Sequence, residues 1–162
     1  MFIIAHRRRR EQKTNFKRRL ALIKSGKPRM VVRKSLEGMS IQFVQFNRDG
    51  DKTLCGAVAQ ELKKSGWSFS LGNTPAAYLT GLLAGKKAKR NNITEAVLDI
   101  GMQTSTKGSR LYAALKGVVD AGVDVPHDKE MFPSDDRILG KHIKGAEGLT
   151  KNFEETKNKI MS

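Results

Sequence analysis

The residues with the clearest capacity for chemistry are the cations gathered near the start of the chain. They include a run of consecutive arginines and a second group that follows closely: Arg7, Arg8, Arg9, Arg10, Lys13, Lys17, Arg18 and Arg19. Guanidinium groups bind phosphate oxygens bidentately, so this pattern predicts a site for the backbone of a nucleic acid. Phe16 lies inside the run, where its ring would either stack on an unpaired base or anchor the segment to the body.

The charge of the whole chain is distributed unevenly. Residues 1–34 hold thirteen Lys or Arg side chains and one acid, a net charge of +12, whereas the other 128 residues carry a net charge of only +3. A strongly basic arm on a nearly balanced body is typical of a protein that binds a polyanion, because phosphate neutralisation releases counterions. The alternative is a solubilising tail, but solubilising surfaces usually mix both signs of charge.

Two other basic clusters and a pair of aromatic residues extend this interpretation. Lys86–Arg90 ends a predicted helix, where cations also suit the helix dipole. Lys107, Ser109 and Arg110 belong to a glycine-containing loop before a second helix, whose backbone N–H groups favour phosphate. Trp67 and Phe69 flank a loop rich in Gly and Ser, and would either stack on bases or anchor that loop.

Motifs for nucleotide chemistry and reactive cysteines are weak in this sequence. Gly81–Lys87 resembles a phosphate-binding loop, but it is one residue short between the glycines and ends in Lys where Ser or Thr would bind magnesium. The single cysteine, Cys55, excludes an intramolecular disulfide and a Cys-based zinc finger, and its apolar surroundings predict a buried thiol. The three histidines are far apart in the chain. We therefore predict no catalytic residue, no metal site and no cofactor.

A metal-dependent nuclease is the enzymatic alternative that we keep open. Its centre would need carboxylates that converge within about 4 Å on paired ions. The candidates are Asp49, Asp51, Asp99, Asp120 and Asp124. Asp99 is expected in a strand, but the others are expected in turns or at helix ends, which disfavours such a centre.

The order of predicted elements indicates an α/β sandwich, in which helices pack on a mixed sheet. Strands are expected at 29–34, 40–46 and 53–59, joined by turns into an antiparallel meander. A short helix at 58–64 is followed by a helix that starts at Thr74 (as N-cap) and Pro75. A buried strand at 93–100, a helix capped by Ser109 and ended by Gly122, and a short strand at 123–125 complete the core.

The chain divides into a basic arm at 1–27, an α/β core domain at 28–126 and a C-terminal extension at 127–162. In the arm, Thr14 or Asn15 should cap a helix with Phe16, Leu20 and Ile23 on one face. We expect the arm and the extension to be disordered in the free protein and to fold on binding. The apolar start is too short for a signal peptide and no apolar run is long enough to span a membrane, so we expect an intracellular protein.

Five stretches in one order make the chain similar to a known family. They are residues 27–35, 72–85, 98–101, 107–117 and 132–138. Together they resemble the large-subunit ribosomal protein L eighteen family in its archaeal and eukaryotic form, over roughly residues 7–143. The resemblance implies a ribonuclease-H-like α/β sandwich without the nuclease acids, and a protein without catalytic activity that binds 5S rRNA at the central protuberance.

The resemblance also assigns roles to residues. It places Arg7, Arg8, Arg9, Arg10, Lys13, Thr14, Asn15, Phe16, Arg18 and Arg19 along 5S rRNA, and more weakly Arg33, Lys34 and the loop from Lys107 to Arg110. We therefore expect a structural constituent of the cytoplasmic ribosome, in contact with 5S rRNA, large-subunit rRNA and neighbouring ribosomal proteins. A membrane or a small-molecule substrate is not expected. A non-specific nucleic-acid-binding protein is the main alternative, ahead of the nuclease.

Overall fold

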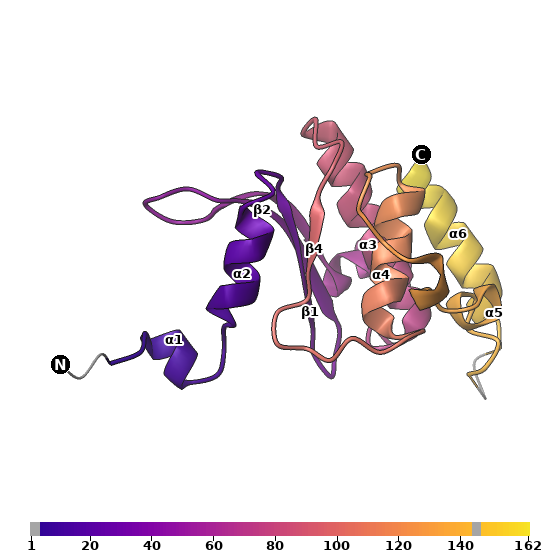
Figure 1. Cartoon of the computed structure of the whole chain (residues 1–162). Helices are drawn as coiled ribbons and strands as arrows, with labels where there is room; N and C mark the ends of the chain where they lie inside the picture. Colours follow the sequence, from indigo (N-terminus) through magenta and orange to yellow (C-terminus); the bar gives the residue numbers. More distant parts are fainter. Residues whose placement is uncertain (1–3, 144–146) are drawn as a thin grey trace.

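A four-stranded mixed sheet lies at the centre of the computed structural model, which describes residues 4–143 and 147–162 (Figure 1). The strand order is β3-β2-β1-β4, with the bounds β1 (Arg29–Lys34), β2 (Met39–Gln45), β3 (Lys52–Val58) and β4 (Val97–Asp99). β2 pairs antiparallel with both β1 and β3, which confirms the predicted meander, and β4 pairs parallel with β1. The predicted α/β sandwich is therefore confirmed.

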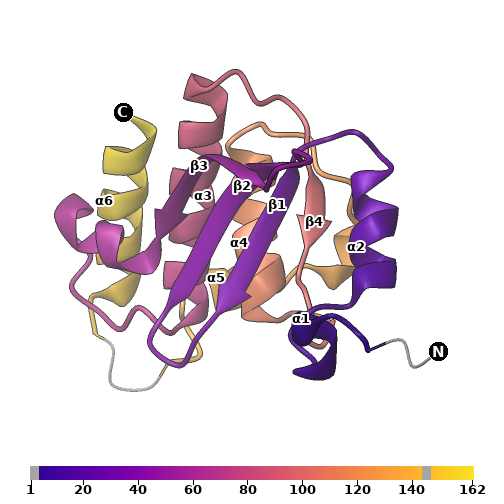
Figure 2. The same cartoon turned by 90° about the vertical axis from the view of Figure 1, so that its left-hand side faces the viewer.

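The two faces of the sheet have different chemistry. Met30 and Val32 of β1, together with Ile41 and Phe43 of β2, are buried beneath the helices α3 (Thr74–Arg90) and α4 (Arg110–Asp120). Because side chains alternate along a strand, Arg29, Val31 and Arg33 of β1 point to the other face. In Figure 2 that second face is toward the viewer, with α3 and α4 behind the sheet.

Glycines set the close approach of α3 to α4. A Cβ atom at Gly81 would lie 2.0 Å from the carbonyl oxygen of Ala114, and one at Gly117 would lie 2.2 Å from that of Tyr78. Gly81–Lys87 is thus part of a packed helix, and the phosphate-loop interpretation is wrong. The N-cap of α3 is Asn73, whose side chain accepts a hydrogen bond from the Ala76 N–H; Thr74, the predicted cap, is the first helical residue.

Three predicted elements of the core differ in detail. The short helix predicted at 58–64 is a 3-10 helix, η1 (Ala59–Ser65), and the strand predicted at 93–100 is reduced to β4. The strand predicted at 123–125 is absent from the described residues, since only Asp124 pairs there, in an isolated bridge with Glu95. Gly122 ends α4 with a φ of 89°, as predicted, and the chain then contacts the sheet too briefly to form a ladder.

The arm and the extension pack on opposite sides of the core. The arm contains α1 (Arg7–Arg10) and α2 (Phe16–Ile23), which lie beside β4 (Figure 2). The extension contains η2 (Lys129–Met131), α5 (Asp135–Ile138) and α6 (Leu149–Met161). Leu149, Phe153 and Ile160 of α6 are buried against the core, with the rings of Phe153 and Tyr78 of α3 5.6 Å apart.

Gly117→Ala is expected to destabilise the fold although Ala is the better helix former. The new methyl would meet the backbone of α3, at Tyr78 and Leu82, which cannot move aside as a side chain can. The cost of overpacking, about 1–3 kcal/mol, exceeds the gain in helix propensity of about 1 kcal/mol. Urea unfolding measures the change, with exposed Lys151→Ala in α6 as the neutral control; unchanged or higher stability of Gly117→Ala would contradict this packing.

Candidate nucleic-acid interface

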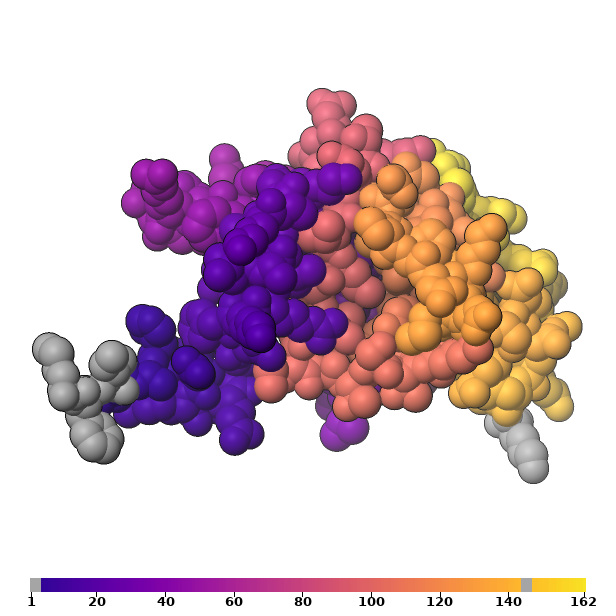
Figure 3. Space-filling model, in the orientation of Figure 1, coloured from indigo at the N-terminus to yellow at the C-terminus, as the bar shows by residue number. Residues whose placement is uncertain are grey.

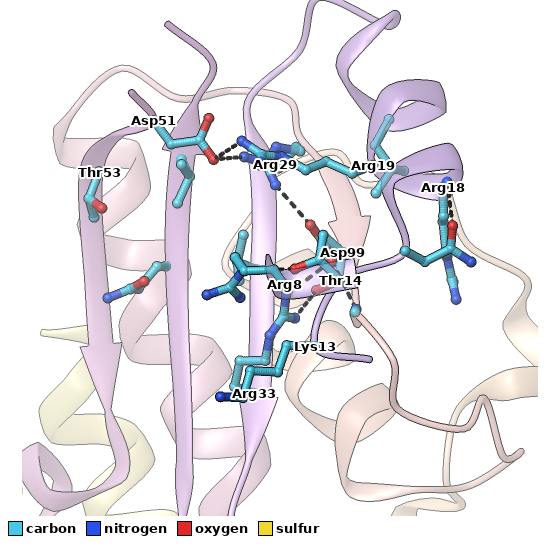
Figure 4. Close-up of a pocket in the computed structure, with 16 residues that line it drawn as sticks. Arg8, Lys13, Thr14, Arg18, Arg19, Arg29, Arg33, Asp51, Thr53 and Asp99 are labelled. Atoms are coloured by element: carbon cyan, nitrogen blue, oxygen red, sulfur yellow. Dashed lines mark hydrogen bonds and ion pairs between the residues drawn. The ribbon is translucent and has the colours of Figure 1, made fainter. Parts of the chain in front are cut away.

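A basic hollow of about 430 Å³ lies between the arm and the helix-free face of the sheet (Figure 4). Its walls come from α1, the α1–α2 connection, α2 and all four strands of the sheet. Six cationic side chains line it: Arg8, Lys13, Arg18, Arg19, Arg29 and Arg33. Among the described residues of its lining, the acids are Asp51 and Asp99, so these residues together carry an excess of positive charge.

A chain of ion pairs forms the floor of this hollow. Arg29 is only 4% exposed, and its guanidinium group donates to Asp99 Oδ2 at 2.9 Å and to Asp51. Arg33 donates to Asp99 Oδ1 at 3.3 Å, and Arg19 donates to Asp51 Oδ2 at 2.8 Å. The chain therefore joins the arm helix α2, the first strand, the start of β3 and the end of β4 through five side chains.

The ion pairs leave the remaining cations available. A buried charge must be paired, and here both acids of the hollow pair with Arg29 and are thus neutralised from within the protein. Arg8 donates from Nε to Thr14 Oγ1 at 2.9 Å, and in the described part of the chain its terminal nitrogens have no partner. Lys13 pairs with exposed Glu11 at 2.9 Å, a surface pair that a phosphate can displace at little cost.

The local structure of the arm explains how its side chains are presented. Arg7, Arg8, Arg9 and Arg10 are all exposed on the short helix α1. Asn15 caps α2 as predicted, since its Oδ1 accepts a hydrogen bond from the Arg18 N–H at 3.0 Å. Phe16 is half-buried, with its ring centre 5.6 Å from that of His6, and it lines a second hollow beside Met102.

The predicted apolar face of the arm helix is partly wrong. Leu20 is 55% exposed, whereas Arg19, Leu22 and Ile23 are partly covered. The inward position belongs to Arg19 because Asp51, the residue before β3, lies opposite it. Arg19, through its ion pair, therefore occupies the inward position that the apolar periodicity predicted for Leu20.

The other predicted RNA-binding residues lie outside the hollow. Lys34 is exposed at the end of β1, and Lys17 is exposed on α2 at the second hollow. Lys107 pairs with exposed Glu130 at 3.0 Å, and Arg110 donates to the carbonyl of Gly72. Ser109 occupies the N-cap position of α4, but its side chain accepts no capping hydrogen bond.

Trp67 and Cys55 can be assigned from their burial. Trp67 is 3% exposed and donates to the carbonyl of Ser70 at 3.2 Å, with its ring edge-on to Phe69. The anchoring interpretation of this pair is thus confirmed, and base stacking is excluded for Trp67 in this arrangement. Cys55 is half-buried rather than fully buried as predicted, and its burial raises the pKa of the thiol.

Of the carboxylates proposed for a nuclease, Asp51 and Asp99 line the same hollow, but both are paired with the guanidinium group of Arg29. Asp99 is held between two guanidinium groups, and Asp120 accepts a hydrogen bond from the Tyr78 hydroxyl at 2.8 Å on another side of the core. Burial, together with that bond, raises the pKa of Tyr78. Within residues 4–143 and 147–162, no group of three or more His, Cys, Asp or Glu side chains could hold a metal ion.

Arg29, the residue at the centre of the ion-pair chain, is absent from the predicted site. Its partner Asp99 is distant in sequence, so no local spacing reveals the pair. The sequence did contain one usable signal, since Arg29 and Arg33 share the strand face opposite to Met30 and Val32. Two cations on the open face of a central strand are typical of a binding surface.

The described chain also contains no helix long and apolar enough to cross a membrane.

Comparisons with known proteins identify the class of the chain. The family described as ribosomal large subunit proteins 60S L5 and 50S L18 matches residues 1–94 and 86–128. The chain is 51% identical over 162 residues to the large ribosomal subunit protein uL18 of Methanococcoides burtonii, covering 98% of this chain and 94% of that protein. It is 56% identical over 140 residues to the protein of the same name from Korarchaeum cryptofilum, covering 86% of this chain and 72% of that protein.

This chain belongs to that family of ribosomal large-subunit proteins. The resemblance of its five sequence stretches to the L eighteen family is confirmed. Its basic hollow and helix-free sheet face are therefore features of a ribosomal protein.

Asp51→Asn is expected to loosen the arm without unfolding the core. The substitution removes the carboxylate charge that holds both Arg19 of α2 and Arg29 of β1. Amide hydrogen exchange of α2 should accelerate, while exchange of α3 and α4 stays unchanged. Asp49→Asn is the matched control, since the described structure shows no ion pair for Asp49.

Equal exchange of α2 in both variants would contradict the role of Asp51. The wild-type protein gives a second result in the same experiment. Wild-type α2 without protection would show that the free arm is disordered, as its composition predicts, and that Asp51 does not hold it in the absence of RNA.

Proposed function

We propose that the protein binds 5S rRNA and helps to attach it at the central protuberance of the large ribosomal subunit. Family membership gives the coarser role, a structural constituent of the large subunit. The observation that supports RNA binding best is the basic surface that runs from the exposed arginines of α1 into the hollow above β1. The proposed role is non-catalytic, in the cytoplasmic ribosome.

The proposed site combines two kinds of contact. Exposed cations on the outside of the arm, Arg7, Arg9, Arg10 and Lys17, would neutralise phosphates and supply affinity without sequence information. Inside the hollow, Arg8, Lys13, Arg18 and Arg33 would follow a particular bend of the RNA backbone. Four further residues of the predicted site stabilise the conformation of the arm: Thr14, Asn15, Phe16 and Arg19. They would act on the RNA mainly by positioning the cations.

The shape of the hollow favours a specific RNA over nucleic acid in general. The major groove of duplex RNA is too deep and narrow for side chains to read, so a protein recognises folded RNA through loops and helix junctions. A packaging protein would need charge alone, whereas here ion pairs fix the arm against the sheet. The remaining residues of the predicted site lie apart from the hollow: Lys34, Lys107, Ser109 and Arg110. We propose that they make peripheral contacts to 5S rRNA or to large-subunit rRNA, near neighbouring ribosomal proteins.

Replacement of Arg8, Arg9 and Arg10 by Gln is expected to weaken binding to 5S rRNA and to reduce its salt dependence. If about eight phosphates are neutralised, the logarithm of the binding constant should fall with the logarithm of salt concentration with a slope of about −6 to −7. Removal of three of these charges should make the slope shallower by about 2 to 3. Filter binding across a salt series measures both quantities.

A variant with Lys63, Lys64 and Lys151 replaced by Gln is the control for net charge. These exposed lysines lie on η1 and α6, away from the arm, and the variant loses the same formal charge. It should keep an affinity and a slope close to those of the wild type. Equal losses in both triple variants would mean that the arm acts only through the total charge of the protein.

A further inference from the structure

The hairpin between β2 and β3 projects beyond the sheet on the same side of the molecule as the arm (Figures 1 and 3). β2 ends at Gln45 and β3 begins at Lys52, so residues 46–51 form the tip. A register shift between Phe43 and Val44 interrupts the ladder just before the tip, and such irregularities bend a strand pair. In the space-filling view, the hairpin adjoins α2, and open space separates its tip from α1.

The tip presents an aromatic ring to solvent. Phe46 is 46% exposed, and it belongs neither to the core nor to the side chains packed against the core. Phe69 and Phe132, by contrast, both pack on the core. A single exposed apolar side chain is unremarkable on its own, so the neighbours of Phe46 decide its interpretation.

Those neighbours are cationic and unengaged. Arg48 and Lys52 are exposed on either side of the turn, and in the described part of the chain neither has an ion pair or a side-chain hydrogen bond. Asp51, the acid closest to the body, already pairs with Arg19 and Arg29. An exposed ring with free cations beside it is the combination that binds an unpaired base and its phosphate.

The orientation of the hairpin is fixed by the same residue that fixes the arm. Asp51 lies at the base of the tip, and it pairs with Arg19 of α2 and with Arg29 of β1. Hairpin and arm are thus connected through one carboxylate, which places the base of the hairpin at the wall of the basic hollow. Asp51 at the base is neutralised, and Arg48 and Lys52 outnumber the other acid of the turn, Asp49, so the tip favours RNA over an acidic or apolar protein surface as the partner.

We infer that the hairpin tip is a second RNA contact, in which Phe46 stacks on an unpaired base and Arg48 binds an adjacent phosphate. This inference rests on the proposed RNA-binding function. It adds a contact by base stacking to a surface whose other proposed contacts are with phosphates. The arm and the hairpin then hold the RNA from two sides, with the hollow between them.

Phe46→Ala tests the stacking. The variant should bind 5S rRNA about 5-fold to 100-fold more weakly, the scale of one stacked base, with an unchanged salt slope because no charge is lost. Leu36→Ala is the matched control: Leu36 is 94% exposed in the turn at the other end of β2, and its removal should leave affinity unchanged. Arg48→Gln should weaken binding and make the slope shallower by about 0.7 to 0.9.

Phe46→Trp provides a direct readout of stacking. The variant should bind as the wild type does, and its new indole fluorescence should be quenched when 5S rRNA is added, whereas buried Trp67 of the wild type gives a constant signal. Wild-type affinity of Phe46→Ala, together with an unquenched indole, would overturn the inference. If Phe46→Ala bound 5S rRNA as the wild type does and failed only in assembly of the large subunit, the tip would be a contact for a ribosomal protein. That result would also overturn the inference.

The same experiments separate this inference from the proposed function. If the wild-type protein does not bind 5S rRNA, the proposed function fails and the hairpin inference fails with it. If the wild type binds and the arm variant is weakened while Phe46→Ala is not, only the hairpin inference fails.

Discussion

The buried guanidinium group of Arg29 is the constraint on which the interface depends. It lies on the first strand with only 4% of its surface exposed, and it holds Asp99 at the end of β4 and Asp51 at the base of the hairpin. A buried charge without partners is costly, and breaking such a pair typically costs about 3–5 kcal/mol. The need to pair Arg29 therefore fixes the relative positions of the sheet edge, the hairpin and, through Arg19, the arm.

The same ion pairs explain how the arm stays packed on the sheet despite the repulsion among its positive charges. The arm brings many like charges close together, which opposes a compact structure. Asp51 and Asp99 offset part of that repulsion from below, and the arginines that they hold define the floor of the hollow. The other cations of the hollow are not paired with Asp51 or Asp99, so their charges remain available to an anion. Asp51 and Asp99 thus organise the hollow, which accounts for the presence of two acids in a basic surface.

Much of the fold could be predicted because its signals are local. Alternating side chains identified β1 and β2, the Asn-Arg-Asp-Gly segment identified the hairpin turn, and Gly122 identified the end of α4. The arm cations were predicted from charge alone, with Asn15 as a possible cap. Arg29 and Asp51 were missed because their partners are distant in sequence. Leu20 was misplaced because an ion pair, which hydrophobic periodicity does not describe, set the orientation of α2.

We propose that the arm, the hollow and the core form one surface for a particular folded RNA. The most direct test is a set of binding curves for 5S rRNA, for an unrelated structured RNA of equal length and for duplex DNA, over a salt series. A preference for 5S rRNA that persists at physiological salt is the result predicted by this structure. Equal affinities that all vanish as salt rises would contradict it, and would reduce the arm to a generic polycation.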